Sequence, residues 1–214
     1  MKLYSYFRSS SSWRVRIALN HKRIDYSYAP IHLLRDGGQQ HRPEFAAVNP
    51  QGMVPVLEVE EGGKTFRLAQ SLAILEYLEE TQPQPPLLPK SPVLRARARQ
   101  LAEIVNSSIQ PLHNLMVLRK VTEELGGERN PWAQDFIRRG LAAFETLAHE
   151  SAGPYAVCEH PTFADVCLVP QLYQARRFGA DLAAFPTCLA IETACLKLEA
   201  FQAAGPDRQP DAER

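Results

Sequence analysis

The spacing of apolar residues changes character along this chain. In the first eighty residues, short runs of strand length alternate with stretches of helical period, in the order β-α-β-α-β-β-α. The strand-like runs are 2–6, 26–30, 54–58 and 65–68, and the helix-like stretches are 12–21, 43–48 and 70–80. This order predicts one mixed sheet with helices packed on it.

Five prolines fall within residues 82–92, a density that ends regular structure and is typical of a linker. After them the strand pattern disappears, and helical periodicity covers 94–124, 132–151, 162–178 and 187–202. We therefore expect an α/β domain over 1–82, a linker over 83–92 and an all-helical domain over 93–214. The polar stretch 206–214 is expected to be loosely ordered.

Composition narrows the possible functions. Lys plus Arg and Asp plus Glu number 24 each, so net charge gives no global support for nucleic-acid binding. The chain has no apolar run of about 18 residues and its first residues lack a signal-peptide pattern, so we expect a cytoplasmic protein without a membrane span. The four cysteines show neither a CxxC pair nor a zinc spacing, so reduced thiols and no metal are expected.

The most informative segment is residues 8–12, Arg8 followed by four serines, which we call the serine loop. It lies at a switch from strand to helix, where serine hydroxyls cap free N–H groups and the positive helix end attracts an anion. Phosphate, carboxylate and thiolate all remain possible on this ground. A second helix begins at Gln70-Ser71, where Ser71 either caps the helix or helps to hold a carboxylate.

Two further motifs have a structural and a functional interpretation. Val54-Pro55 stands at a strand start, where a trans bond is the ordinary expectation and a cis bond would expose the Val54 backbone to a ligand. Thr162 and Asp165 have capping-box spacing, which predicts a structural helix start.

Together these features resemble the cytosolic glutathione transferases over nearly the whole chain. The run from Ser9 to Leu19 is similar to the zeta-class signature, with Ser11 where that class usually has cysteine. Further similarity to the class lies at 4–8, 36–40, 70–74, 109–115 and 167–171. The resemblance implies an N-terminal thioredoxin-like domain, an all-helical C-terminal domain and a homodimer.

The resemblance also implies an activity. It is a glutathione-dependent cis–trans isomerisation of maleylacetoacetate to fumarylacetoacetate, in tyrosine and phenylalanine breakdown, through reversible addition of a thiolate to the double bond. The alternatives are isomerisation of maleylpyruvate, transferase or dehalogenase activity on small α-halo acids, and a non-catalytic glutathione-binding module. The residues 109–115 favour maleylacetoacetate over maleylpyruvate.

Residue roles follow from the resemblance. Ser9 is the first choice to activate the glutathione sulfur, Ser10 is the alternative, and Arg8 is expected to assist catalysis. The implied glutathione contacts are Ser9, Ser10, Ser11, Arg14, Gln40, Val54, Pro55, Gln70, Ser71, Gln110 and Asn114.

Charge and spacing add three expectations. Arg8 and Arg176 are candidates to bind the carboxylates of a small dicarboxylate substrate. For Arg176, which stands beside Arg177, a solvated helix charge is the alternative. Gln110 and Asn114 are four residues apart, which would place both on one helix face. Arg16 is expected to make a structural ion pair.

Overall fold

A computed structural model describes residues 1–150 and 153–213. The chain forms two compact units, one made of Met1–Pro85 with Leu198–Arg214 and the other of Pro86–Lys197. The division thus groups the C-terminal segment with the first unit, whereas the sequence placed it in a helical domain over 93–214. The domain boundaries at 82 and 93 stay a prediction.

The first unit is built on a four-stranded mixed sheet in the order β2-β1-β3-β4. Its strands are β1 (Lys2–Ser5), β2 (Ser27–Pro30), β3 (Val56–Glu61) and β4 (Lys64–Ala69). Strand β1 runs parallel to β2 and antiparallel to β3, which pairs with β4 in a hairpin. The hairpin turns at Gly62 and Gly63, both with positive φ, as a tight primed turn requires. The predicted mixed sheet is confirmed.

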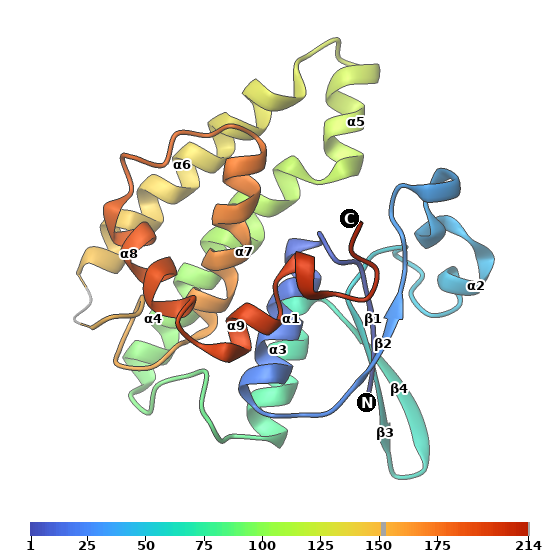
Figure 1. Ribbon diagram of the computed structural model, residues 1–214, viewed down its shortest axis with the longest axis horizontal. Coiled ribbons are helices and arrows are strands. Elements are labelled where there is room, and N and C mark those ends of the chain that lie inside the picture. The colour runs from blue at the N-terminus through green and yellow to red at the C-terminus, as the bar shows by residue number, and fades with distance from the viewer. Residues whose placement is uncertain (151–152, 214) are drawn as a thin grey trace. The chain divides into compact units, whose positions relative to one another are not determined.

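Three helices accompany the sheet. Helices α1 (Ser10–His21) and α3 (Ser71–Thr81) lie side by side on one face, and the short α2 (Pro43–Ala46) lies on the other side (Figure 1). Two 3-10 turns, Arg35–Gly37 and Gln39–His41, lead into α2. Helix α9 (Glu199–Ala203), from the C-terminal segment, packs against α1. Helix α1 is therefore covered on several sides, which explains why nearly all of its residues are buried.

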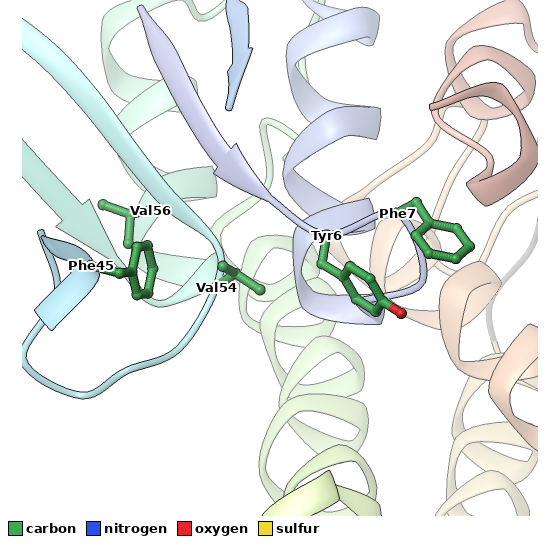
Figure 2. Packing of buried hydrophobic residues seen from close by; sticks show 5 residues of the cluster. All are labelled: Tyr6, Phe7, Phe45, Val54 and Val56. Atoms are coloured by element: carbon green, nitrogen blue, oxygen red, sulfur yellow. The ribbon is translucent and has the colours of Figure 1, made fainter. Parts of the chain in front are cut away.

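A small apolar cluster fixes the place where the serine loop begins. Tyr6, Phe7, Phe45, Val54 and Val56 pack together beneath the end of β1 (Figure 2). Tyr6 and Phe7 directly follow β1, Phe45 lies in α2, and Val54 and Val56 stand just before and at the start of β3. Burial of these side chains holds three segments that are distant in sequence at one end of the sheet.

Arg16 is fully buried in α1, and its hydrogen bonds hold the same strand end. Its Nη2 donates to Phe7 O at 2.9 Å, and its Nη1 donates to Ser5 Oγ at 3.0 Å and Tyr6 O at 3.3 Å. Its Nε donates to Ala204 O at 3.0 Å. The structural role is as expected, but the expected ion pair is wrong: within the described residues no carboxylate lies at ion-pair distance from this guanidinium.

The expectation of a loosely ordered tail is also wrong for its described part. After a 3-10 turn at Pro206–Arg208, Gln209 Nε2 donates to Ala203 O at 2.9 Å and Gly205 O at 2.8 Å. Asp211 accepts the Phe7 N–H at 3.0 Å. These bonds give a polar segment partners that its own sequence does not reveal. Arg214 lies outside the described residues.

The second unit is helical in its described residues. Its helices are α4 (Pro92–Glu103), α5 (Leu115–Glu123), α6 (Arg129–His149), α7 (Phe163–Arg177) and α8 (Pro186–Cys195). Helix α7 is buried along most of its length between α4 and α8. The predicted capping box is confirmed: Asp165 Oδ2 accepts the Thr162 N–H at 2.7 Å and the Thr162 hydroxyl at 2.8 Å.

Two predicted helices are interrupted. The stretch 94–124 contains a π-helical turn at Ile104–Ile109 and a 3-10 turn at Gln110–His113 before α5 begins, because Pro111 has no N–H to donate. The stretch 187–202 divides into α8 and α9. The predicted end of the stretch 132–151, Ser151, lies outside the described residues. None of the described helices is both long and apolar enough to cross a membrane.

Replacement of Arg16 by Met tests its structural role. The change leaves the four acceptors of this side chain buried without their donors, so we expect the free energy of unfolding to fall by about 3–5 kcal/mol. Urea denaturation measures it. The control Arg42→Met removes an exposed arginine paired with Asp36 and should cost less than about 1 kcal/mol. Equal losses for the two variants would contradict the role.

Candidate active site

Ser9 occupies the N-cap position of α1. Its backbone is extended, with φ −68° and ψ 115°, and its Oγ accepts the Ser12 N–H at 3.2 Å. Because this bond uses a lone pair of the oxygen, the hydroxyl proton of Ser9 is left to donate to another group. Ser9 and Ser11 are half-buried, whereas Ser10 is buried. Ser9 thus combines an accessible hydroxyl with the positive end of a helix.

A second helix start is tied to the first. Arg14, fully buried in α1, donates from Nη1 to Ser71 Oγ at 3.1 Å. Ser71 is the first residue of α3 and follows the N-cap Gln70, so the predicted helix start is confirmed while Ser71 itself is not the N-cap. The bond joins α1 to the beginning of α3. The free N–H groups at the start of α3 therefore belong to the same unit as those at the start of α1.

Gln70 precedes α3 in a conformation that side chains rarely adopt, with φ 70° and ψ 113°. Its side chain is exposed and donates from Nε2 to Gln51 Oε1 at 2.9 Å. A non-glycine residue with such backbone angles costs about 1–3 kcal/mol and is typical of ligand-binding positions. The strain marks the turn between β4 and α3 as a candidate binding segment.

Val54 and Pro55 are joined by a cis peptide bond, the less expected of the two possibilities. They precede Val56, the first residue of β3 to pair with β1 and β4, so the Val54 backbone lies outside the ladder. The Val54 side chain points into the cluster of Figure 2. This leaves the Val54 backbone as the group available to a ligand.

Gln40 lies in the turn Gln39–His41, and its Nε2 donates to Leu33 O at 3.3 Å. Its buried Oε1 has no hydrogen-bond partner among the described residues. Gly38, with φ 99°, allows this side chain to fold back, since a Cβ there would lie 2.6 Å from Gln40 Nε2. Such a buried carbonyl oxygen is suited to accept an N–H group of a ligand.

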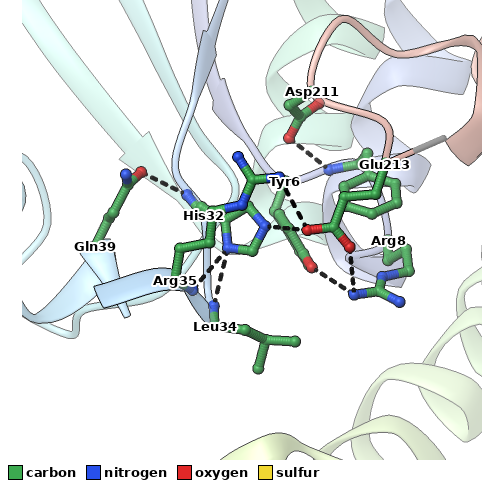
Figure 3. Close-up of polar contacts among 9 residues, drawn as sticks. Tyr6, Arg8, His32, Leu34, Arg35, Gln39, Asp211 and Glu213 are labelled. Carbon is green, nitrogen blue, oxygen red and sulfur yellow. Dashed lines mark hydrogen bonds and ion pairs between the residues drawn. The ribbon is translucent and has the colours of Figure 1, made fainter. Parts of the chain in front are cut away.

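Arg8 belongs to a polar cluster that the sequence did not predict (Figure 3). It donates from Nη2 to the Tyr6 hydroxyl at 3.0 Å and lies 3.6 Å from Glu213 Oε2. His32 Nε2 and Arg35 Nη2 lie 3.0 Å and 3.1 Å from Glu213 Oε1. One carboxylate from the C-terminal segment therefore contacts three side chains at the edge of the serine loop.

The contacts of Nδ1 determine which ring nitrogen of His32 carries the proton. Nδ1 accepts the N–H of Leu34 at 3.2 Å and that of Arg35 at 2.9 Å, so it carries no proton. Nε2 is then the protonated nitrogen and donates to Glu213. This hydrogen bond is the largest cause that holds the pKa of Glu213 below its usual value, with Arg35 and Arg8 adding to it.

The other predicted residues lie in the second unit. Gln110 begins the 3-10 turn, while Asn114 is extended and caps α5 by accepting the Met116 N–H at 3.1 Å. The expectation that both share one helix face is wrong, because no continuous helix joins them. Arg176 pairs with Glu192 through two bonds, Nη1 to Oε1 at 2.6 Å and Nη2 to Oε2 at 2.5 Å, which raises the Arg176 pKa.

Comparison with known proteins identifies the family. Residues 3–86 match the family model of the glutathione S-transferase N-terminal domain. The maleylacetoacetate isomerase of Rattus norvegicus is 52% identical over 98% of this chain and 94% of its own length. The chain belongs to the zeta class of glutathione transferases.

Solved structures of this class share the fold. The maleylacetoacetate isomerase of Anaeromyxobacter dehalogenans, with bound glutathione in its active site, has a TM-score of 0.91 and 52% identity over 99% of this chain and 97% of its own. That protein was also solved with dicarboxyethyl glutathione and citrate in its active site. A bacterial zeta-class maleylpyruvate isomerase has a TM-score of 0.93 and 40% identity, with full coverage of both chains.

Sequence reasoning missed several residues that surround the serine loop of this zeta-class chain. Tyr6 and Glu213 contact Arg8, and Asp211 accepts the Phe7 N–H. His32 and Arg35 join the same cluster through Glu213. The two acidic residues lie about two hundred positions from the loop, and no local periodicity connects them. The sequence feature that could have indicated them is the group of charged residues within the polar segment 206–214.

The backbone strain at Gln70 has a direct test. Gln70→Ala and Gln70→Gly both remove the side chain, so their difference reports the backbone alone. Because glycine adopts positive φ freely, we expect the glycine variant to be more stable by about 1–2 kcal/mol in urea denaturation. A glycine variant that is less stable than the alanine variant, as at ordinary positions, would show that the turn is not strained.

Proposed function

We propose that this zeta-class chain is a glutathione-dependent enzyme that isomerises maleylacetoacetate to fumarylacetoacetate. The observation that carries the proposal is the geometry of Ser9, whose accessible hydroxyl keeps its proton free at the positive end of α1. The full-length likeness to a maleylacetoacetate isomerase supports the choice of substrate. The likeness to a maleylpyruvate isomerase makes that smaller substrate the comparison to include.

The residues of the first unit fit glutathione. The tripeptide offers a thiol, peptide N–H and C=O groups and carboxylates, and the unit offers a partner for each kind of group. Ser9 supplies a donor, the buried Gln40 Oε1 an acceptor, and Val54 a free backbone edge. The start of α3 at Gln70-Ser71 supplies helix N–H groups for a carboxylate. Pro55, Ser10, Ser11 and Arg14 complete the proposed contacts of this unit. Gln110 and Asn114, which belong to the second unit, stay proposed contacts from the resemblance to the class.

When bound, glutathione supplies the thiolate that adds reversibly to the substrate double bond. Ser9 holds the sulfur in its charged form, since a donated hydrogen bond and the end of α1 both favour the anion. Ser10 is the alternative donor. Arg8, next to Ser9, is proposed to hold a substrate carboxylate and to stabilise negative charge that develops during the reaction.

Further properties belong to the same proposal. Membership of the zeta class supports a homodimer and a place in tyrosine and phenylalanine breakdown. A cytoplasmic location is proposed with them, as are domain boundaries at 82 and 93. Transferase or dehalogenase activity on small α-halo acids is the secondary activity to assay.

Ser9→Ala tests the central step. We expect wild-type enzyme to isomerise maleylacetoacetate faster than maleylpyruvate, and only with glutathione. Loss of a hydrogen bond to a charged sulfur should lower kcat/KM by about 10- to 100-fold. Absorbance assays with both substrates measure kcat/KM. In the Ser9→Ala variant, the ultraviolet absorbance of the bound thiolate, followed against pH, should show that the pKa of the glutathione thiol is higher than in the wild type.

Two variants separate chemistry from helix capping. Ser9→Asp keeps an N-cap acceptor but has no hydroxyl proton, so it should remain stable and inactive. Ser12→Ala removes a buried hydroxyl that has no hydrogen-bond partner among the described residues, and it should stay active. Near-normal isomerisation by Ser9→Ala would exclude the activating role.

Arg176 needs a different comparison, because Glu192 already holds its guanidinium. If Arg176 binds a substrate carboxylate, Arg176→Leu should raise KM about 10-fold, the effect of losing one charged hydrogen bond. The matched variant Glu192→Gln breaks the same ion pair but keeps the arginine, so stability should fall by about 1 kcal/mol with little change in KM. Steady-state kinetics and urea denaturation give both readouts, and identical effects of the two changes would leave Arg176 a purely structural role.

A further inference from the structure

We propose that Arg8, His32 and Arg35 form an anion subsite for the carboxylate of a small organic acid, and that Glu213 occupies it as an internal competitor. The cluster lies wholly within the first unit and beside the serine loop (Figure 3). The identification of the subsite rests on its own contacts. Only its use by the substrate rests on the proposed function.

The contacts match those that recognise a free carboxylate. Glu213 Oε1 lies 3.0 Å from His32 Nε2 and 3.1 Å from Arg35 Nη2, while Oε2 lies 3.6 Å from Arg8 Nη2. Both oxygens of one carboxylate thus face donors, two of them permanently charged. His32 is fixed as a donor by the two N–H groups on its Nδ1. The subsite keeps this chemistry whichever carboxylate fills it.

The surrounding segments hold the donors in place. The loop that carries His32 and Arg35 is closed by Gln39, whose Oε1 accepts the His32 N–H at 2.8 Å and whose N–H donates to His32 O at 2.8 Å. Arg8 is oriented by the Tyr6 hydroxyl, at 3.0 Å, and its guanidinium lies over the Phe7 ring. His32 and Arg8 are therefore held by groups other than Glu213, and Arg35 follows on the same ordered loop as His32.

The tail is anchored at one residue and exchangeable at another. Asp211 binds the Phe7 N–H at 3.0 Å and the Tyr28 hydroxyl at 2.7 Å, both partly buried. Two residues later, the Glu213 side chain is 39% exposed and its partner Arg35 is 63% exposed. Exposed ion pairs contribute little to stability, so Glu213 can leave while Asp211 stays bound. A tethered carboxylate at high effective concentration then competes with a free one.

Malonate, a small inert dicarboxylate, is the probe for this competition. Calorimetric titration of malonate into the full-length protein without glutathione compares wild type with Glu213→Gln. If the Glu213 carboxylate fills the subsite in most molecules, its removal should tighten malonate binding by about 3- to 10-fold, because the subsite is then open in every molecule. The variant Glu213→Gln/Arg35→Gln should lose this gain, because the cation that receives malonate is gone.

A matched control removes the effect of net charge. Glu199→Gln eliminates an exposed carboxylate of the same unit and should bind malonate like wild type. Unchanged or weaker binding by Glu213→Gln, or an equal gain in Glu199→Gln, would overturn the inference. Urea denaturation confirms that each variant is folded. An isomerase assay run in parallel keeps the proposals apart, since malonate can bind more tightly to Glu213→Gln even if no isomerisation occurs.

Discussion

The guanidinium of Arg16 lies fully buried, and its hydrogen bonds go to carbonyl groups and a serine hydroxyl. Burial lowers the pKa of Arg16 to about 10, so the group stays charged at neutral pH. A buried charge is costly unless its donors are satisfied, and here three consecutive residues at the end of β1 provide the acceptors. This side chain therefore binds the segment that follows β1 to α1, and together with the apolar cluster around Tyr6 and Phe7 it positions the start of the serine loop.

The same interaction brings the C-terminal segment into the first unit. Arg16 also donates to the Ala204 carbonyl oxygen. Phe7 contacts both partners: its carbonyl oxygen accepts from Arg16, and its N–H donates to Asp211. The polar groups of the strand end are thus divided between a residue of α1 and a residue of the tail. Removing either partner would leave buried donors or acceptors unsatisfied. The serine loop is therefore supported by parts of the chain about two hundred residues apart.

This division explains what the sequence could predict. The mixed sheet, the N-cap at Ser9 and the capping box at Thr162 depend on neighbours within a few residues, and local patterns contain that information. The partners of Arg16, the ordered tail and the Glu192 pair of Arg176 depend on contacts between distant segments. Gln110 and Asn114 show an intermediate case, because their spacing suggested one helix face while Pro111, between them, interrupted it.

The chemistry of the serine loop also depends on which groups are absent from it. Cys158, Cys188 and Cys195 lie outside the first unit. Burial raises the pKa of their thiols, so these cysteines remain protonated at neutral pH. The loop has Ser11 where the class usually has cysteine, and a serine hydroxyl stays neutral at the positive end of α1. A thiol at that place would be drawn toward its anion by the same helix end and would repel a second thiolate. Because the four serines of the loop carry only neutral hydroxyls, no thiolate of the protein competes at the positive end of α1 with the sulfur anion that the proposed function places there.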